Sequence, residues 1–230
     1  MADLADCVQL VLSLLRFTHI VSGTILYDGV DITTLPRRKL REALTIIPQE
    51  PVLFSGTVES NLDPSGKVPK EILESAIDEC RGIASFQYLS EHGGALNGTN
   101  GDANGAAEGD SLARSAEGIA LTTTVQSKGE NFSHGQRQVL SLCRALIRKS
   151  KLMLLDEATA SMDYETDRGI QQVLREELNA HGRDRTLVTI AHRLRTVIDY
   201  DLIVVMGAGK VLEYDTSHLL RFAQRWGAER

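Results

Sequence analysis

The spacing of apolar residues along the chain changes repeatedly between a helical and a strand-like period. Residues 8–17 are apolar nearly all round, which predicts a buried helix. Apolar positions three or four residues apart predict further helices, at residues 36–42, 70–89, 136–149 and 167–179. Short apolar runs bounded by turn residues predict strands, at residues 24–27, 44–47, 151–156, 186–191 and 201–206. Alternating strands and helices predict an α/β domain.

One of these strands has a sequence typical of a sheet interior. The run LMLLD, residues 152–156, is continuously apolar and ends in an acid. Such runs are typical of parallel strands that are buried on both faces, because helices cover both sides of a parallel sheet. We therefore expect a mostly parallel sheet flanked by helices.

A segment near the middle of the chain lacks this patterning. Residues 91–128 include GGALNGTNGDANGAAEGD, which is rich in Gly, Asn, Ala and Asp. Such a composition cannot bury enough apolar surface to offset the entropy of ordering the backbone. Because periodic structure resumes after it, we interpret residues 91–128 as a flexible insert within one partial domain, residues 1–230.

Composition and charge exclude several classes of function. The chain is 42% hydrophobic and 24% charged, with a net charge of −6, so no general attraction to nucleic acid or to anionic lipid is expected. The basic run PRRKLR is interpreted as the solvated face of a short helix. Three cysteines that lie far apart do not indicate a disulfide framework or a zinc site. No apolar run is long enough to span a membrane.

Polar side chains that could take part in binding or catalysis follow three of the predicted strands. Gln49 follows the strand at 44–47, Asp156 and Glu157 follow the LMLLD run, and His192 follows the strand at 186–191. Because ligands bind at the carboxyl ends of strands in open α/β sheets, these four side chains should share one rim. Each alone has an ordinary structural explanation, and their common placement favours a site.

The residue types suggest phosphoryl-transfer chemistry. Asp156 suits a hard cation such as Mg²⁺, and Gln49 offers the same ion a neutral oxygen. Glu157 is placed to orient or deprotonate an attacking water, and His192 to bond a terminal phosphate. Phosphoryl transfer depends mostly on positioning and charge stabilisation, which these residues can supply.

The stretch FSHGQ, residues 132–136, precedes a predicted helix. Ser133 and Gly135 would present a hydroxyl and backbone N–H groups at the helix N-terminus, which is a natural anion site. The competing interpretation is that Ser133 is only a helix N-cap.

Read together, these stretches resemble the nucleotide-binding domain of an ABC transporter. PQEPVLFSGTVESNLDP resembles the Q-loop segment of the multidrug-resistance-associated C subfamily, especially of its second nucleotide-binding domain. NFSHGQRQ resembles the signature motif, KLMLLDE the Walker B motif, ASMD the D-loop and TIAHRL the H-loop. The order and spacing agree over residues 8–220 apart from the insert. The resemblance implies a P-loop NTPase-like fold, with a mostly parallel sheet and a small helical subdomain.

The resemblance also implies cofactors and partners. In this family ATP and Mg²⁺ lie between two facing nucleotide-binding domains, which drive export from the cytoplasmic face of a membrane. Gln49, Asp156, Glu157 and His192 would then serve the chain's own ATP. Ser133, Gly135, Gln136 and Asp163 of the signature and D-loop would serve the composite sites, and the partners would be a second nucleotide-binding domain and the transmembrane domains.

Two departures from the family pattern change the expectation. His134 stands where the signature normally has Gly, which adds bulk beside the phosphate approach. No GxxxxGK[ST] P-loop is found, and DCVQ, residues 6–9, stands where the family has Gly-Lys-Ser-Ser. We therefore expect a domain that lacks the Walker A strand and loop, exposes LMLLD for want of that strand, and is inactive alone.

Three interpretations remain open from sequence alone. The chain is either the shortened motor domain of an export transporter, or a non-catalytic module that lends FSHGQ to a partner's ATP, or a soluble ABC protein without a transport role. The C-subfamily character of the Q-loop segment disfavours the third.

Overall fold

The structure is a computed structural model that describes residues 4–87, 119–156, 162–180, 185–191 and 199–216. The chain divides into two compact units. The first unit comprises residues 1–49, 149–161 and 178–230, and the second comprises residues 50–148 and 162–177. The described residues contain no helix that is both long and apolar enough to cross a membrane.

A three-stranded parallel sheet forms the centre of the first unit. Its order is β3 (Leu44–Ile47), β6 (Leu152–Asp156) and β7 (Thr186–Ile190), so β6 has a neighbour on each side. The first four residues of β6 are buried, which confirms the expectation of a strand covered on both faces. The expectation that LMLLD would be exposed is wrong, because β3 and β7 satisfy its backbone on both edges.

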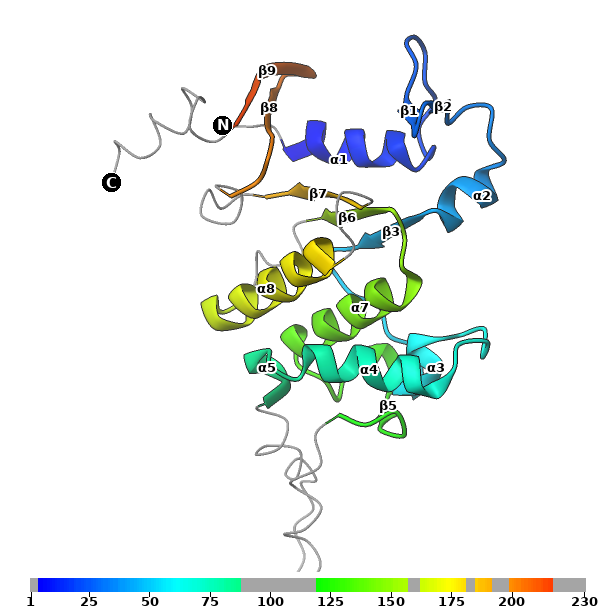
Figure 1. The fold of residues 1–230 in the computed structure, drawn as a ribbon, viewed down its shortest axis with the longest axis vertical. Helices are drawn as coiled ribbons and strands as arrows, with labels where there is room; N and C mark the ends of the chain where they lie inside the picture. The colour runs from blue at the N-terminus through cyan, green and yellow to red at the C-terminus, as the bar shows by residue number, and fades with distance from the viewer. Residues whose placement is uncertain (1–3, 88–118, 157–161, 181–184, 192–198, 217–230) are drawn as a thin grey trace, which may run out of the picture. The chain divides into compact units, whose positions relative to one another are not determined.

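Helix α1 (Leu4–Leu14) lies along one face of this sheet (Figure 1). The core of the first unit combines apolar side chains from α1, the sheet and the short helix α2 (Arg37–Glu42). Its buried members are Val11, Leu15, Ile32, Leu40, Leu44, Leu152, Leu154 and Ile190. Residues 6–9, which the sequence aligns with Gly-Lys-Ser-Ser, are part of α1.

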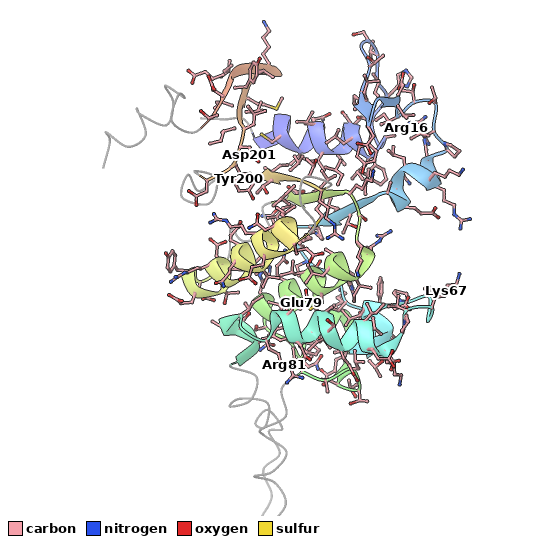
Figure 2. All side chains as sticks on the ribbon, viewed as in Figure 1. Arg16, Lys67, Glu79, Arg81, Tyr200 and Asp201 are labelled. Carbon is pink, nitrogen blue, oxygen red and sulfur yellow. The ribbon has the colours of Figure 1, made fainter. Side chains whose placement is uncertain are left out.

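The end of α1 differs from the sequence expectation. The helix ends at Leu14 and not at residue 17, and the backbone reverses at Arg16, whose φ is +54°. The Arg16 guanidinium donates hydrogen bonds to the carbonyl oxygens of Ile32 at 3.0 Å and Leu35 at 2.6 Å (Figure 2). Phe17 is consequently exposed and stacks under the Arg41 guanidinium, 4.2 Å from its ring centroid.

Two antiparallel hairpins complete the first unit. β1 (Leu26–Tyr27) pairs with β2 (Val30–Asp31) across a two-residue turn. Both turn residues, Asp28 and Gly29, have positive φ, as a two-residue hairpin turn of this kind requires. The second hairpin joins β8 (Ile203–Gly207) to β9 (Lys210–Asp215), with a register shift after Val205.

The second unit is mostly helical. Helix α7 (His134–Arg148) packs against α3 (Val58–Leu62), α4 (Lys70–Cys80) and α5 (Ala84–Gln87), and α8 (Tyr164–Ala180) begins in this unit. The predicted apolar stripe of α7 is confirmed, since Val139, Leu142, Cys143 and Leu146 are all buried. A small antiparallel pair, β4 (Gly56–Thr57) with β5 (Thr124–Val125), leads into a 3₁₀ turn, η1 (Ser127–Gly129).

The predicted helix at 70–89 is broken into two. α4 ends at Cys80, and α5 begins at Ala84. Gly82 lies in the break, where its low helix propensity favours interruption. Ile83 is turned inward and fully buried, and a Cβ built at Gly169 of α8 would lie 3.3 Å from it. Burial of Ile83 therefore outweighs continuation of the helix.

The region assigned to the insert is only partly described. Residues 91–118 lie outside the described residues. Residues 119–128 are described, and their backbone pairs through β5 with β4. Ile119, Leu121 and Val125 of this stretch are buried, so patterned structure begins before the expected boundary at residue 128.

Candidate functional site

Gln49 and Asp156 lie beyond the same edge of the parallel sheet. Asp156 is the last residue of β6, and Gln49 follows the last residue of β3 by two positions. The register pairs Ile47 with Leu155, so the two strands reach their carboxyl ends together. Asp156 is half-buried and Gln49 is exposed. The structure thus brings together two of the four residues predicted for this rim.

The other two predicted rim residues, Glu157 and His192, lie outside the described residues. Glu157 directly follows β6, and His192 follows Ile190 of β7 by two positions. Because Asp156 pairs with Ile190 in the sheet, the backbone of β7 ends at the same edge. Their participation in the site stays a prediction.

The donor set at this edge fits a hard cation. Burial raises the pKa of the Asp156 carboxyl above its usual value. The ionised carboxylate has therefore lost hydration that no other group there fully replaces. A cation bound at the edge would supply that compensation. Mg²⁺ is commonly held by one or two protein oxygens, with waters and phosphate oxygens completing the shell, and Asp156 and Gln49 provide such oxygens. No cluster of three or more His, Cys, Asp or Glu residues occurs in the described part of the chain.

Replacing Asp156 by Asn is expected to stabilise the metal-free chain at pH 7. The raised pKa means that the folded state binds the Asp156 proton more tightly than the unfolded state does. Ionisation of Asp156 therefore costs stability, and the cost is present at neutral pH and disappears as the pH falls below about 4, the ordinary Asp range. Urea unfolding should give a higher midpoint for Asp156→Asn at pH 7 and equal midpoints near pH 3. A lower midpoint at pH 7 would show that the carboxylate stabilises the fold.

The start of α7 carries the second group of candidate residues. The backbone N–H of Gln136 donates to the Ser133 hydroxyl oxygen at 3.2 Å, and the backbone N–H of Ser133 donates to Gln136 Oε1 at 2.7 Å. This reciprocal pair is a capping box, which satisfies two of the N–H groups that a helix start leaves unpaired. Ser133 is exposed, and Gln136 is buried. Gln136 is thus engaged by the cap itself.

Gly135 occupies a position where a side chain would be crowded. A Cβ built there would lie 3.1 Å from Ser85 Cβ in α5 and 3.7 Å from Thr166 Cγ2 in α8. Glycine therefore lets the first turn of α7 approach its neighbours closely. The structure brings Ser133, Gly135 and Gln136 together in one helical turn, with the exposed Ser133 hydroxyl beside the positive end of a 15-residue helix.

Asp163 caps the start of α8. Thr166 donates to Asp163 through its amide at 2.9 Å and through its hydroxyl at 2.7 Å. These hydrogen bonds lower the pKa of the Asp163 carboxyl. From the sequence only a cofactor-binding role is expected of Asp163, and the cap was not predicted, although an Asp directly before a helical segment is a recognisable helix start.

Sequence reasoning missed one polar network in the second unit. Arg144 of α7 donates from Nε to the Asn61 carbonyl oxygen at 2.7 Å, from Nη1 to the Val52 carbonyl oxygen at 2.7 Å and from Nη2 to Asn61 Oδ1 at 2.9 Å. The available signal was Arg144 as the one charged residue in the segment 139–147, since a partly buried charge needs hydrogen-bond partners.

Comparisons with known proteins agree with these features. The family described as "ABC transporter" matches residues 8–160. The chain is 44% identical over 214 residues to the ATP-binding cassette transporter abc1 of Schizosaccharomyces pombe, covering 93% of this chain and 13% of that protein. It is 39% identical over 211 residues to the ATP-dependent bile acid permease of Saccharomyces cerevisiae, covering 92% and 12%.

A plant relative and a solved structure show the same likeness. The chain is 39% identical over 207 residues to ABC transporter C family member 9 of Arabidopsis thaliana, covering 90% of this chain and 12% of that protein. The solved structure of a bacterial Atm1-family ABC exporter with ATP bound matches with a TM-score of 0.73 and 25% identity, covering 98% of this chain and 35% of that one. The chain thus spans about an eighth of the length of these curated relatives.

Proposed function

We propose, because the chain belongs to the ABC transporter family, that it is the second nucleotide-binding domain of a C-subfamily export transporter. The family relationship establishes an ATP-binding domain with a P-loop NTPase fold. The similarity to the Arabidopsis C-family member supports the subfamily assignment. The observation that carries the functional proposal is the placement of Gln49 and Asp156 at one carboxyl edge of the sheet.

The proposed roles follow from the chemistry of each side chain. Asp156 and Gln49 would hold Mg²⁺, and the ion would supply neutralising charge to phosphate oxygens when bound. Glu157 would orient and deprotonate the attacking water, and His192 would bond the terminal phosphate and keep water and base in line. These roles concern the ATP held on the chain's own rim.

The start of α7 is proposed to serve a different ATP molecule. Ser133 and the backbone of Gly135 would contact the triphosphate that a second nucleotide-binding domain holds in its P-loop. The capping box supports this role, because it fixes the first turn of α7 and leaves the Ser133 hydroxyl hydrogen free to donate. Asp163, whose side chain is exposed at the start of α8, is proposed to complete the contact between the two domains.

The 230 residues contain no P-loop pattern, so we propose that the chain alone neither binds nor hydrolyses ATP. Catalysis then requires a P-loop supplied by another polypeptide segment or subunit. A second candidate function follows from the intact cap of α7. The chain would act as a non-catalytic module that lends Ser133 and Gly135 to a partner's ATP without turning over nucleotide at its own rim.

The proposed membrane partner would dock on the loop that follows Gln49. Val52 and Phe54 are 58% and 62% exposed there, and apolar side chains held outward in this way are typical of protein interfaces. We propose that transmembrane domains, which the names of the relatives as transporters and permeases support, bind this loop and place the chain at the cytoplasmic face of a membrane.

Val52→Asp is expected to abolish co-purification with the membrane-spanning part of the transporter. The change places a charge at the apolar contact without touching the buried core. Val21→Asp is the matched control, since Val21 is exposed in the first unit and receives the same substitution. Affinity capture of tagged chain variants from detergent extract measures the difference. Equal capture of both variants would contradict docking on this loop.

A further inference from the structure

The Arg144 side chain joins two separate segments of the second unit. Its three hydrogen bonds all go to residues 52 and 61, more than eighty positions earlier in the chain. All three acceptors are uncharged oxygens, and burial lowers the pKa of the guanidinium. Hydrogen bonds from a charged donor are short and strong, and a planar fork fixes the geometry of several acceptors at once. Arg144 therefore holds the Val52 backbone at a fixed place on α7.

A second contact fixes the same loop near the beginning of α7. Leu53 is 1% exposed, and a Cβ built at Gly129 would lie only 2.7 Å from Leu53 Cδ1. Gly129 has a φ of +69°, which glycine adopts at little cost. The Arg137 guanidinium of α7 donates to the carbonyl oxygens of Gly129 and Phe132, both at 3.4 Å. Leu53 is thus seated against the turn that leads into the Ser133 cap.

Asn61 makes the loop itself rigid. The Phe54 amide donates to Asn61 Oδ1 at 2.8 Å, and Asn61 Nδ2 donates to the carbonyl oxygens of Phe54 at 2.7 Å and Thr57 at 3.0 Å. The loop, residues 52–57, therefore has its backbone held from inside while Val52 and Phe54 point to solvent. Because the Asn61 side chain is buried and both of its polar atoms are hydrogen-bonded, this network favours one conformation of the loop.

We propose that Arg144 is a positioning residue that makes loop 52–57 and α7 one rigid piece, so that displacement of Val52 and Phe54 by a docked partner moves the Ser133 cap. Arg144 contacts no proposed phosphate ligand and acts through α7. The link between the loop and α7 rests on the hydrogen bonds alone. Its effect on ATP hydrolysis rests also on the proposed function.

Amide hydrogen exchange of the full chain without nucleotide tests the link. In Arg144→Met, which keeps the stem and loses the fork, the Phe54 amide should exchange at least ~10-fold faster, while the amides of Leu142 and Leu146 within α7 change less than ~3-fold. Arg148→Met is the control on the same helix, because Arg148 is exposed, and it should leave all three rates unchanged. Unchanged exchange at Phe54, or a uniform acceleration of the whole helix, would overturn the proposal.

Two further measurements keep the proposal falsifiable. Arg144→Lys keeps the charge but cannot bridge Val52 and Asn61 with a fork, so its Phe54 amide should also exchange faster, and wild-type behaviour would contradict the need for the fork. If neither variant folds, the wild-type chain suffices. Its Phe54 amide should be protected at least ~100-fold relative to an unstructured peptide, and exchange at the unstructured rate would overturn the link.

The effect of Arg144 on ATP hydrolysis can be tested separately from the link between loop 52–57 and α7. In a mixed assembly with a P-loop-bearing nucleotide-binding domain of the same family, Arg144→Met should lower kcat about 10-fold and leave KM for ATP unchanged, since Arg144 touches no phosphate. A change in KM alone, or no change in either constant, would overturn the transmission to the cap. An assembly in which the wild-type chain has no effect on hydrolysis would refute the proposed function and leave the exchange result standing.

Discussion

Titration of Mg-ATP into the 230-residue chain is expected to give no saturable heat up to millimolar nucleotide. A P-loop holds the phosphates with a lysine and several backbone N–H groups, and neither Gly-Lys pair of this chain, at Gly66-Lys67 and Gly209-Lys210, fits that pattern. The positions aligned with the P-loop lie in helix α1. Asp6 at those positions adds negative charge to the segment.

The size of the expected effect follows from the hydrogen bonds that are missing. Charge-assisted hydrogen bonds contribute roughly 1.5–3 kcal/mol each, so a lost lysine and several donors remove on the order of 5–10 kcal/mol. A micromolar site has only about 8 kcal/mol of binding free energy in total. Isothermal titration calorimetry at 25 °C is the measurement. A micromolar dissociation constant for the chain alone would show that phosphates are gripped elsewhere.

Ser133→Asp is expected to abolish the chain's contribution to a partner's ATP site without destabilising the chain. Aspartate caps helices as well as serine does, so the Gln136 amide keeps an acceptor. The new carboxylate would however face the triphosphate. Two like charges about 4 Å apart repel by about 4 kcal/mol at an effective dielectric constant of 20, which corresponds to about a thousandfold. We expect at least a ~100-fold loss of ATP hydrolysis in the mixed assembly.

Ser133→Ala separates the cap from the phosphate contact. It removes the capping oxygen and should lower the unfolding free energy by about 1 kcal/mol. It also removes one hydroxyl donor, which we expect to lower hydrolysis about 10-fold. Unfolding and hydrolysis should therefore rank the two variants in opposite order. The alanine variant should be the less stable one, and the aspartate variant the less active one. If the aspartate variant supports hydrolysis as well as wild type, Ser133 is a structural cap and nothing more.

Much of the first unit could be predicted from the sequence because its signals are local. The apolar run of β6 sets a buried parallel strand, and the register with β3 then places Gln49 and Asp156 at one edge. The turn at Asp28 and Gly29 follows from residues that accept positive φ. In each case a few neighbouring residues carry the information.

The features that sequence reasoning missed depend on distant parts of the chain. The break between α4 and α5 depends on burial of Ile83 against Gly169, eighty-six positions away. The partners of Arg144 lie more than eighty positions before it. β6 was expected to be exposed, and this was wrong because β6 lies between β3 and β7 in the sheet. The order of strands in a sheet cannot be read from the apolar sequence of one strand. Tertiary packing therefore decided each of these outcomes.

The central claim is that this chain completes an ATP site only together with a P-loop from another domain. The most direct measurement is the Mg-ATP affinity of three samples: the chain, a P-loop-bearing nucleotide-binding domain of the same family, and their equimolar mixture. We predict no binding by the chain and binding at least ~10-fold tighter by the mixture than by the P-loop domain alone, which corresponds to about 1.4 kcal/mol. A mixture that binds no more tightly than the P-loop domain, or a chain that binds Mg-ATP unaided, would contradict the account.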